Sequence, residues 1–319
     1  MVTEASAPTS DTGRMPKRRN SARWIVAGTA FVLVTVAISA GGVILGRHLA
    51  PSTASSPQSS VSAPQAPAPS PPLVGTAPSN LEADFAQLQA QLHAPVGIAV
   101  TAVGSNQPPM KLGVQQSGPA WSTIKVPLAI AALRQENPPT TVTSAMSAAI
   151  TESDNTAAES IWAGLGDPVT AAHQVEAVLQ ETGDPTTVEY RKVRPEFTAF
   201  GQTDWSLADQ VKFLSSAVCD PRNDPIFALM GEVVPDQRWG IGTIPDSRFK
   251  GGWGPSPTGN YLVRQIGTLN APTGTVAVAI AVAPASGSFD DGTSDLTEVA
   301  NWMRDHLAAL PAGHCSSPG

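Results

Sequence analysis

The sequence predicts an α+β fold in which an antiparallel sheet is flanked by helices. Apolar runs typical of buried strands occur at 96–103, 261–269 and 275–283, near both ends of one region. Between them, much of 121–182 is rich in alanine and shows no strand pattern. Because strands and helices are segregated along the chain, an antiparallel sheet is favoured over alternating parallel units. We expect the first strand to join the last two in one sheet, so that residues 81–311 form a single domain.

The individual elements follow from local patterns. A first amphipathic helix is predicted from apolar residues at helical spacing, namely Leu81, Phe85, Leu88 and Leu92. After the strand at 96–103, residues 104–106 are expected to form a turn. An apolar helix is predicted at 121–133, and residues 142–182 are expected to be helical throughout, with a break near 164–168.

The C-terminal part is expected to hold a hairpin and a closing helix. Residues 270–274 would form the loop between the last two strands. The apolar face of the closing helix would consist of Leu296, Val299, Ala300, Met303, Leu307 and Leu310. Residues 312–319 would form a short tail.

The N-terminal part has the composition of a membrane anchor and a tether. Residues 1–23 are basic and are expected to form a cytoplasmic tail. The uncharged segment 24–46 is about as long as the hydrocarbon core requires, and its basic flank places the following chain outside the cell membrane. The alternative is a cleaved signal peptide, although its apolar region would be unusually long. The Pro/Ser/Ala-rich residues 47–80 are expected to form an extended linker.

Charge and composition exclude several functions. The net charge is −7, and the excess of acid lies beyond the basic N-terminus, so nucleic acid is not an expected partner. The histidines show no metal-ligand spacing, and neither a metal nor another cofactor is expected. Cys219 and Cys315 would form one disulfide in an oxidising compartment, and otherwise two free thiols.

Two serine–lysine pairs at S-x-x-K spacing occur in the chain. Ser122 and Lys125 stand on a predicted helix, where residues three apart share a face, so the amine can take the proton of the hydroxyl. Ser122 also begins that helix, where unpaired backbone N–H groups favour negative charge. Ser247 and Lys250 instead lead into a strand-like segment, where residues three apart face opposite ways. The Ser122 pair is therefore the candidate for catalysis.

Two further motifs follow in order. Ser153-Asp154-Asn155 lies among the predicted helices, and Lys250-Gly251-Gly252 precedes Trp253 and the predicted hairpin. Each motif alone is equally compatible with a helix cap or a turn. Their order after a serine–lysine pair favours a common site.

This ordered set resembles the motifs of penicillin-recognising serine enzymes, the active-site-serine β-lactamases and penicillin-binding transpeptidases and carboxypeptidases. The segment 149–158 is similar to the class A β-lactamase segment around its second motif. The segments 239–242 and 249–254 are similar to β-lactamase-like proteins of actinobacteria. The resemblance covers about 81–310 and implies the β-lactamase/transpeptidase-like fold.

The resemblance also implies roles for these residues. Ser122 would be acylated, Lys125 would activate it, and Ser153 would pass a proton to the leaving nitrogen. Asn155 would bind substrate and Lys125, and Lys250 would face the substrate carboxylate.

Gly252 and Trp253 would complete the substrate side of the cleft. The backbone N–H of Trp253 would join that of Ser122 in an oxyanion hole.

The chain departs from the family pattern in three ways. Ser122 and Ser153 stand at about half the class A spacing, which implies a reduced helical subdomain. Gly251 replaces a hydroxyl residue, so one donor to the substrate carboxylate is lost. Arg264 is a candidate replacement for that donor.

The third departure concerns the glutamate that activates the deacylating water. Glu189 and Glu196 are the candidates, but neither lies in a recognisable version of the loop motif. If neither serves, acylation would outrun hydrolysis.

Two functions are therefore expected to compete. The first is a membrane-anchored extracytoplasmic serine hydrolase acting on a β-lactam or a peptidoglycan-like peptide. The second is a catalytically silent relative that binds cell-wall material or a partner. Retention of all five motif residues favours the enzyme.

Overall fold

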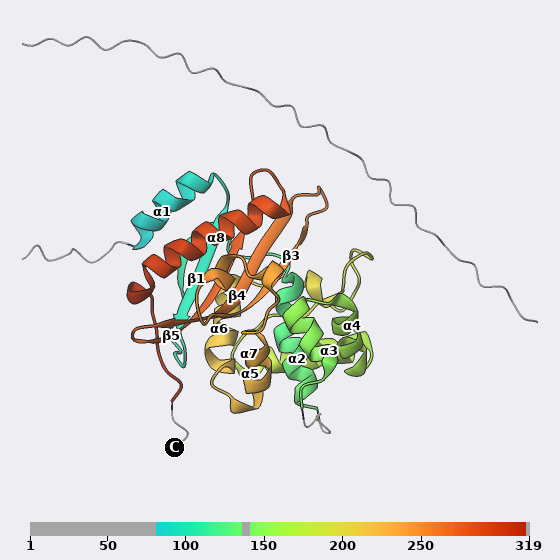
Figure 1. The fold of residues 1–319 in the computed structure, drawn as a ribbon. Helices are drawn as coiled ribbons and strands as arrows, with labels where there is room; N and C mark the ends of the chain where they lie inside the picture. The colour runs from blue at the N-terminus through green and yellow to red at the C-terminus, as the bar shows by residue number, and fades with distance from the viewer. Residues whose placement is uncertain (1–80, 136–140, 317–319) are drawn as a thin grey trace, which may run out of the picture. The chain divides into compact units, whose positions relative to one another are not determined.

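A five-stranded antiparallel sheet forms the centre of the domain (Figure 1). The computed structural model describes residues 81–135 and 141–316. The strands lie in the order β2-β1-β5-β4-β3. Their bounds are β1 (Val96–Ala102), β2 (Met110–Gly113), β3 (Arg248–Pro255), β4 (Tyr261–Ala271) and β5 (Gly274–Val282). The first strand therefore pairs with the last, as expected, and one sheet joins the two ends of the domain.

Helices cover both faces of this sheet (Figure 1). One face carries α1 (Leu81–Leu92) and α8 (Phe289–Asp305). The other carries α6 (Leu207–Ala217), beside a helical layer that consists of α2 (Lys125–Leu133), α3 (Ser144–Ser147), α4 (Asn155–Gly164), α5 (Pro168–Glu181) and α7 (Asp224–Leu229). The arrangement confirms the predicted α+β class.

The sequence of β5 explains how both faces become buried. Val276, Val278 and Ile280 alternate with small alanines, and successive strand residues point to opposite faces. The larger side chains belong to the apolar cluster under α1 and α8. The alanines belong to the cluster under α6 and the helical layer, where small side chains let the helix approach closely.

Several local predictions needed correction. The short strand β2 was missed because four residues give too little alternation to detect. The hairpin between β4 and β5 is tighter than predicted, since β4 extends to Ala271 and β5 begins at Gly274. The closing helix ends at Asp305, so Leu307 lies beyond it in a short turn.

The predicted helical run at 142–182 has a further break at Ser153, besides the one expected near 164–168. The wide turn Ala148–Glu152 ends there, and Ser153 has a left-handed backbone with φ 59°. Asp154 then caps α4 by accepting a hydrogen bond from the N–H of Ala157 at 2.7 Å. The break places the Ser153-Asp154-Asn155 motif at a helix junction rather than inside a helix, because serine and aspartate favour caps.

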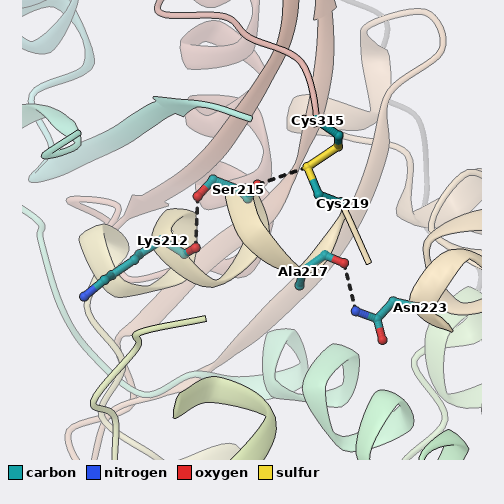
Figure 2. Close-up of a disulfide and its surroundings, with 6 residues drawn as sticks. All are labelled: Lys212, Ser215, Ala217, Cys219, Asn223 and Cys315. Carbon is teal, nitrogen blue, oxygen red and sulfur yellow. Dashed lines mark hydrogen bonds between the residues drawn. A yellow bond between two sulfur atoms is a disulfide. The ribbon is translucent and has the colours of Figure 1, made fainter. Parts of the chain in front are cut away.

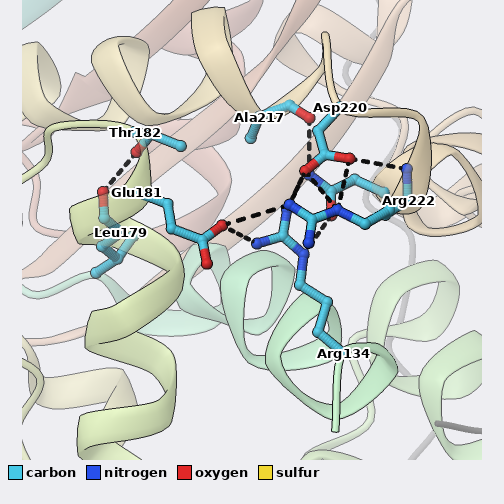
Figure 3. Close-up of polar contacts among 8 residues, drawn as sticks. Arg134, Leu179, Glu181, Thr182, Ala217, Asp220 and Arg222 are labelled. Atoms are coloured by element: carbon cyan, nitrogen blue, oxygen red, sulfur yellow. Dashed lines mark hydrogen bonds and ion pairs between the residues drawn. The ribbon is translucent and has the colours of Figure 1, made fainter. Parts of the chain in front are cut away.

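A cluster of ion pairs fixes the far end of α2 (Figure 3). Arg134, just after α2, contacts Glu181 at the end of α5 and lies 2.7 Å from Asp220. Arg222 shares Asp220 at 2.6 Å. Arg134 is largely buried, so this network holds α2, and with it Lys125, against the helical layer.

A disulfide joins Cys219, after α6, to Cys315 near the C-terminus (Figure 2). Nearby, Gly313 exchanges backbone hydrogen bonds with Thr275 at the start of β5. The last described residues are therefore held against the start of β5.

The predicted cytoplasmic tail 1–23, membrane segment 24–46 and linker 47–80 lie outside the described residues. Within 81–135 and 141–316, no helix is both long and apolar enough to cross a membrane.

Candidate active site

Ser122 lies in a short 3-10 turn, Trp121–Ile124, that leads directly into α2. The residue before it, Trp121, has φ 48°, a conformation that side-chain-bearing residues rarely adopt. Such strain persists only where the surroundings enforce it, and it is common at functional sites. Ser122 itself is half-buried, so its hydroxyl is presented at the surface of a cleft.

Strand β3 approaches this turn very closely at Gly252. A Cβ atom placed on Gly252 would lie 2.9 Å from the backbone nitrogen of Ser122 and 2.9 Å from the carbonyl oxygen of Ala120. Only glycine allows this approach. The contact brings Trp253, the next residue of β3, beside Ser122, where both line the same cavity.

Lys125 lies one helical turn after Ser122 and is almost completely buried. Its Nζ donates to the carbonyl oxygens of Ser153 at 2.6 Å and Asp154 at 3.3 Å. It also donates to Oδ1 of Asn155 at 2.8 Å. The second motif is thus folded around the amine of the first.

Burial lowers the pKa of Lys125 from 10.5 to about 7, although the charge of Asp154 opposes the shift. Removing an ammonium from water disfavours its charged form. A lysine with this pKa is largely neutral at slightly alkaline pH. It can therefore accept a proton from a hydroxyl, which an ordinary lysine cannot do.

Lys250, in β3, also contacts Ser153. Its Nζ donates to Oγ of Ser153 at 2.8 Å and to the carbonyl oxygen of Gly251 at 2.9 Å. Burial, reinforced by the positive charge of Lys125, holds the pKa of Lys250 well below its ordinary value. Ser153 therefore has one lysine on its carbonyl oxygen and the other on its hydroxyl.

A cavity of about 200 Å³ surrounds Ser122. Its walls come from the Ser122 turn, the start of α4, the loop before residue 200 and the end of β3: Trp121, Ser122, Asn155, Phe197, Thr198, Trp253, Gly254, Pro255 and Tyr261. None of these lining residues is acidic or basic.

The two glutamates predicted for deacylation lie outside that wall. Glu189 is held by Arg191, with Oε1 2.9 Å from the arginine Nε, and these hydrogen bonds lower its pKa to about 2. Glu196 is exposed and pairs with Arg194 at 3.1 Å. Glu196 does line a neighbouring polar cavity, which shares Asn155 and Phe197 with the Ser122 cavity.

The packing around residue 251 explains why a glycine stands there. A Cβ atom on this residue would lie 3.2 Å from the ring of Trp239 and 3.5 Å from that of Trp253. The two indoles already pack edge to face, with ring centroids 5.9 Å apart. A hydroxyl residue at this position would press against the aromatic pair.

Arg264 does not replace the missing hydroxyl. It is fully buried, and its guanidinium donates to the carbonyl oxygens of Gly118 at 2.7 Å and Pro119 at 3.0 Å. It also donates to Oε1 of Gln210 at 2.6 Å. Its donors therefore support the chain that precedes Ser122 instead of entering the cleft.

Gln210 extends this support to the other side of the nucleophile. Its Nε2 donates to Oγ1 of Thr123 at 3.0 Å, and Thr123 in turn donates to the carbonyl oxygen of Ala120 at 2.6 Å. The buried chain Arg264–Gln210–Thr123 thus holds the turn on both sides of Ser122. A polar residue between apolar ones, such as Gln210 in α6, was the only sequence signal for it.

The fold is similar to that of solved class A β-lactamases. The TLA-3 extended-spectrum β-lactamase superposes with a TM-score of 0.59 at 18% identity, over 73% of this chain and 100% of that one. The TLA-1 extended-spectrum β-lactamase gives the same TM-score and identity over the same shares.

An ancestral class A β-lactamase (GNCA) gives a TM-score of 0.55 at 18% identity, over 71% of this chain and 99% of that one. The chain has the β-lactamase fold. No family model and no curated protein matches the sequence. The likeness of 239–242 and 249–254 to actinobacterial proteins stays a prediction.

The structure brings together most of the residues singled out by the β-lactamase motifs. Lys125, Ser153, Asn155 and Lys250 are joined by hydrogen bonds, and Ser122 and Trp253 share a cavity with Asn155. Glu189 does not line the Ser122 cavity, and Glu196 lines the neighbouring one. Their roles stay predictions.

Proposed function

We propose that the protein is a serine acyl-transfer enzyme of the β-lactamase and penicillin-binding type, acylated on Ser122 by a β-lactam or a cell-wall peptide. The observation that carries the proposal is the meeting of two buried lysines, Lys125 and Lys250, at Ser153 beside the Ser122 turn. Two buried amines side by side destabilise a fold. Such groups in a cleft are typical of catalytic sites.

Acylation begins with proton transfer from Oγ of Ser122 to the neutral amine of Lys125. The oxygen then attacks the substrate carbonyl carbon. The negative charge that develops on the carbonyl oxygen is stabilised by the backbone N–H groups of Ser122 and Trp253. Gly252 makes this arrangement feasible, because β3 lies against the turn there.

The leaving group departs with a proton from Ser153. Its hydroxyl donates to the departing nitrogen and is supplied in turn by Lys250, whose amine lies 2.8 Å away. A substrate carboxylate near Lys250 would raise the pKa of that amine and favour its charged form. The products are an ester on Ser122 and a free amine.

Release of the acyl group is proposed to be slow. None of the residues that line the Ser122 cavity carries a carboxylate, and the candidate glutamates are paired with arginines. Water at the ester would then lack a strong general base. The protein would hold a β-lactam rather than destroy it rapidly.

Intact-mass spectrometry with a reactive β-lactam tests the proposal. Wild type should gain the mass of the intact lactam, and the adduct should persist for minutes or longer. Ser122→Ala should gain nothing. Ser247→Ala, which removes the serine of the other S-x-x-K sequence, should be acylated like wild type.

The absence of an adduct on wild type, together with no turnover of chromogenic lactams and esters, would contradict the proposal that the protein is an enzyme. That result would favour the silent relative, which binds cell-wall material in the same cleft. An adduct retained in Ser122→Ala would move the nucleophile elsewhere.

We also propose that residues 24–46 anchor the domain outside the cell membrane. The uncharged segment with its basic flank supports this, and a disulfide suits an oxidising compartment. Protease treatment of intact cells should remove the domain and leave a membrane-bound fragment. Recovery of a full-length, protease-protected chain would contradict the anchor.

A further inference from the structure

A second and larger cavity, of about 470 Å³, adjoins the cavity of Ser122. The two share four wall residues, Trp121, Gly254, Pro255 and Tyr261. The second cavity extends behind these residues, between the chain that precedes Ser122, the loop around Val193 and the β3–β4 hairpin. A group bound on Ser122 would have to pass these shared residues to enter it.

The walls of this second cavity are mainly apolar. They include Pro119, Val193, Pro257, Leu262 and Ala283, and Val193 is 64% exposed although it is a large apolar residue. Covering such a surface with an apolar group is favourable because it removes apolar area from water.

The one charged wall residue is already engaged. The guanidinium of Arg194 donates to the carbonyl oxygen of Pro255, pairs with Glu196 and lies 4.3 Å from the ring centre of Phe197. It is therefore not an open partner for an anionic ligand, and the pocket favours hydrocarbon over charge.

The direction of β3 decides which half of a substrate would enter. Lys250 and Ser153, which serve the leaving group, lie toward the start of the strand. Gly254 and Pro255, which open onto the apolar cavity, lie beyond Trp253 at its end. The acyl half of the substrate therefore points to the apolar cavity, and the leaving group points away from it.

We propose that Ser122 prefers acyl donors whose acyl group is an alkyl or arylalkyl chain long enough to fill this cavity. The proposal rests on the acyl-transfer function of Ser122 and names its substrate class. With an ester, the bond from Ser122 Oγ to the acyl carbon forms and the carbon–oxygen bond of the alcohol breaks. The alcohol leaves with a proton delivered through Ser153. Water then adds to the acyl carbon, the bond to Ser122 Oγ breaks, the carboxylic acid is released and Oγ is protonated again.

Hydrolysis of p-nitrophenyl acetate, butyrate, hexanoate and octanoate by the purified protein provides the test. After subtraction of the Ser122→Ala rate, kcat/KM should rise by roughly fourfold per methylene group that becomes buried. Val193→Asp should abolish the rise by placing a charge in the cavity wall. Val114→Asp is the matched control, because Val114 is 68% exposed and does not line the cavity.

A second pair of variants changes volume instead of charge. Ala283→Leu should fill the cavity and reduce the octanoate rate at least tenfold, with the acetate rate unchanged. Ala285→Leu, two residues further and outside the cavity wall, should behave like wild type.

A Ser122-dependent rate that is flat across the four esters would overturn the cavity proposal and leave the acyl-transfer function standing. The same holds if Val193→Asp and Val114→Asp, or Ala283→Leu and Ala285→Leu, have equal effects. The absence of any Ser122-dependent release of p-nitrophenol, with no β-lactam adduct, would overturn both.

Discussion

The two S-x-x-K sequences of this chain have the same spacing and opposite structural outcomes. Ser122 and Lys125 lie on a 3-10 turn that runs into a helix, so the two residues are neighbours on one side of it. Ser247 precedes β3 and Lys250 lies within it. Ser247 is buried, and its hydroxyl has no hydrogen-bond partner among the described residues. Lys250 faces away toward Ser153, 2.8 Å from its hydroxyl.

The comparison shows that the same sequence spacing lets two side chains cooperate on one kind of element and not on another. A separation of three residues brings two side chains together on a helix and places them on opposite faces of a strand. Lys250 nevertheless belongs to the site, because β3 lies against the Ser122 turn at Gly252. The lysine of the second pair thus serves the serine of the first.

The largest expected effect is the loss of acylation rate when Lys125 or Lys250 is replaced. Lys125→Met should lower the acylation rate about 10²- to 10⁴-fold, because it removes the base of Ser122. Lys250→Met should also lower it, because Ser153 loses its proton source. Stopped-flow acylation by a chromogenic β-lactam measures both.

Lys111→Met, which removes an exposed lysine of β2, is the control for charge alone. A loss smaller than tenfold in Lys125→Met, with its fold intact, would show that Lys125 is not the base.

The next effect is the pH dependence of acylation. The pKa of Lys125 is lowered to about 7 by burial, so the neutral amine predominates above that pH. The acylation rate should rise about tenfold per pH unit below about 7 and level off above it. A flat profile between pH 5 and 9 would contradict the assignment of Lys125, and a plateau reached only near 10 would show an unshifted lysine.

The third prediction breaks the contact that joins β3 to the nucleophile. Gly252→Ala would place a methyl group 2.9 Å from backbone atoms of the Ser122 turn. The overlap should destabilise the fold by roughly 1–3 kcal/mol and slow acylation. Thermal unfolding and acylation rates measure the two effects.

Gly164→Ala provides the control, because a Cβ there meets no atom within 4 Å and the residue ends α4. It should be neutral, or more stable by up to about 1 kcal/mol. If both alanine variants behave alike, the close approach of β3 is not a constraint on the site.

The smallest effect is expected at Ser247. Removing a buried hydroxyl that makes no hydrogen bond lifts a desolvation cost, so Ser247→Ala should keep stability or raise it by about 1 kcal/mol. Acylation should be unchanged. A destabilisation above 2 kcal/mol in chemical denaturation would show that the hydroxyl has a partner in solution.

The fold class and most of the motif geometry were predictable from the sequence because they depend on local periodicity and on order along the chain. The apolar run at 275–283 indicated a buried strand, which is β5 in the structure. The helix start at Ser122 was expected from the sequence, whereas the break before Asn155, with its left-handed Ser153, was not.

The tertiary contacts were not predictable in the same way. Arg264 was a candidate donor to the substrate carboxylate, but it donates to the carbonyl oxygens of Gly118 and Pro119. The direction of a long side chain depends on which chain packs over it, and no local pattern records that. The apolar cavity likewise joins segments that lie far apart in sequence, around Pro119, Val193 and Ala283.

The Cys219–Cys315 disulfide closes a covalent ring around part of the site. The two cysteines are 96 residues apart, and the enclosed chain contains β3, β4, β5 and α8. Lys250 and Trp253 therefore lie inside the ring, and Ser122, Lys125 and Ser153 lie outside it. A ring of this size is worth roughly 4–5 kcal/mol through the entropy of the unfolded chain. A chain synthesised among reducing thiols would have to assemble its cleft without that help, so its yield of folded protein should depend on where it is made.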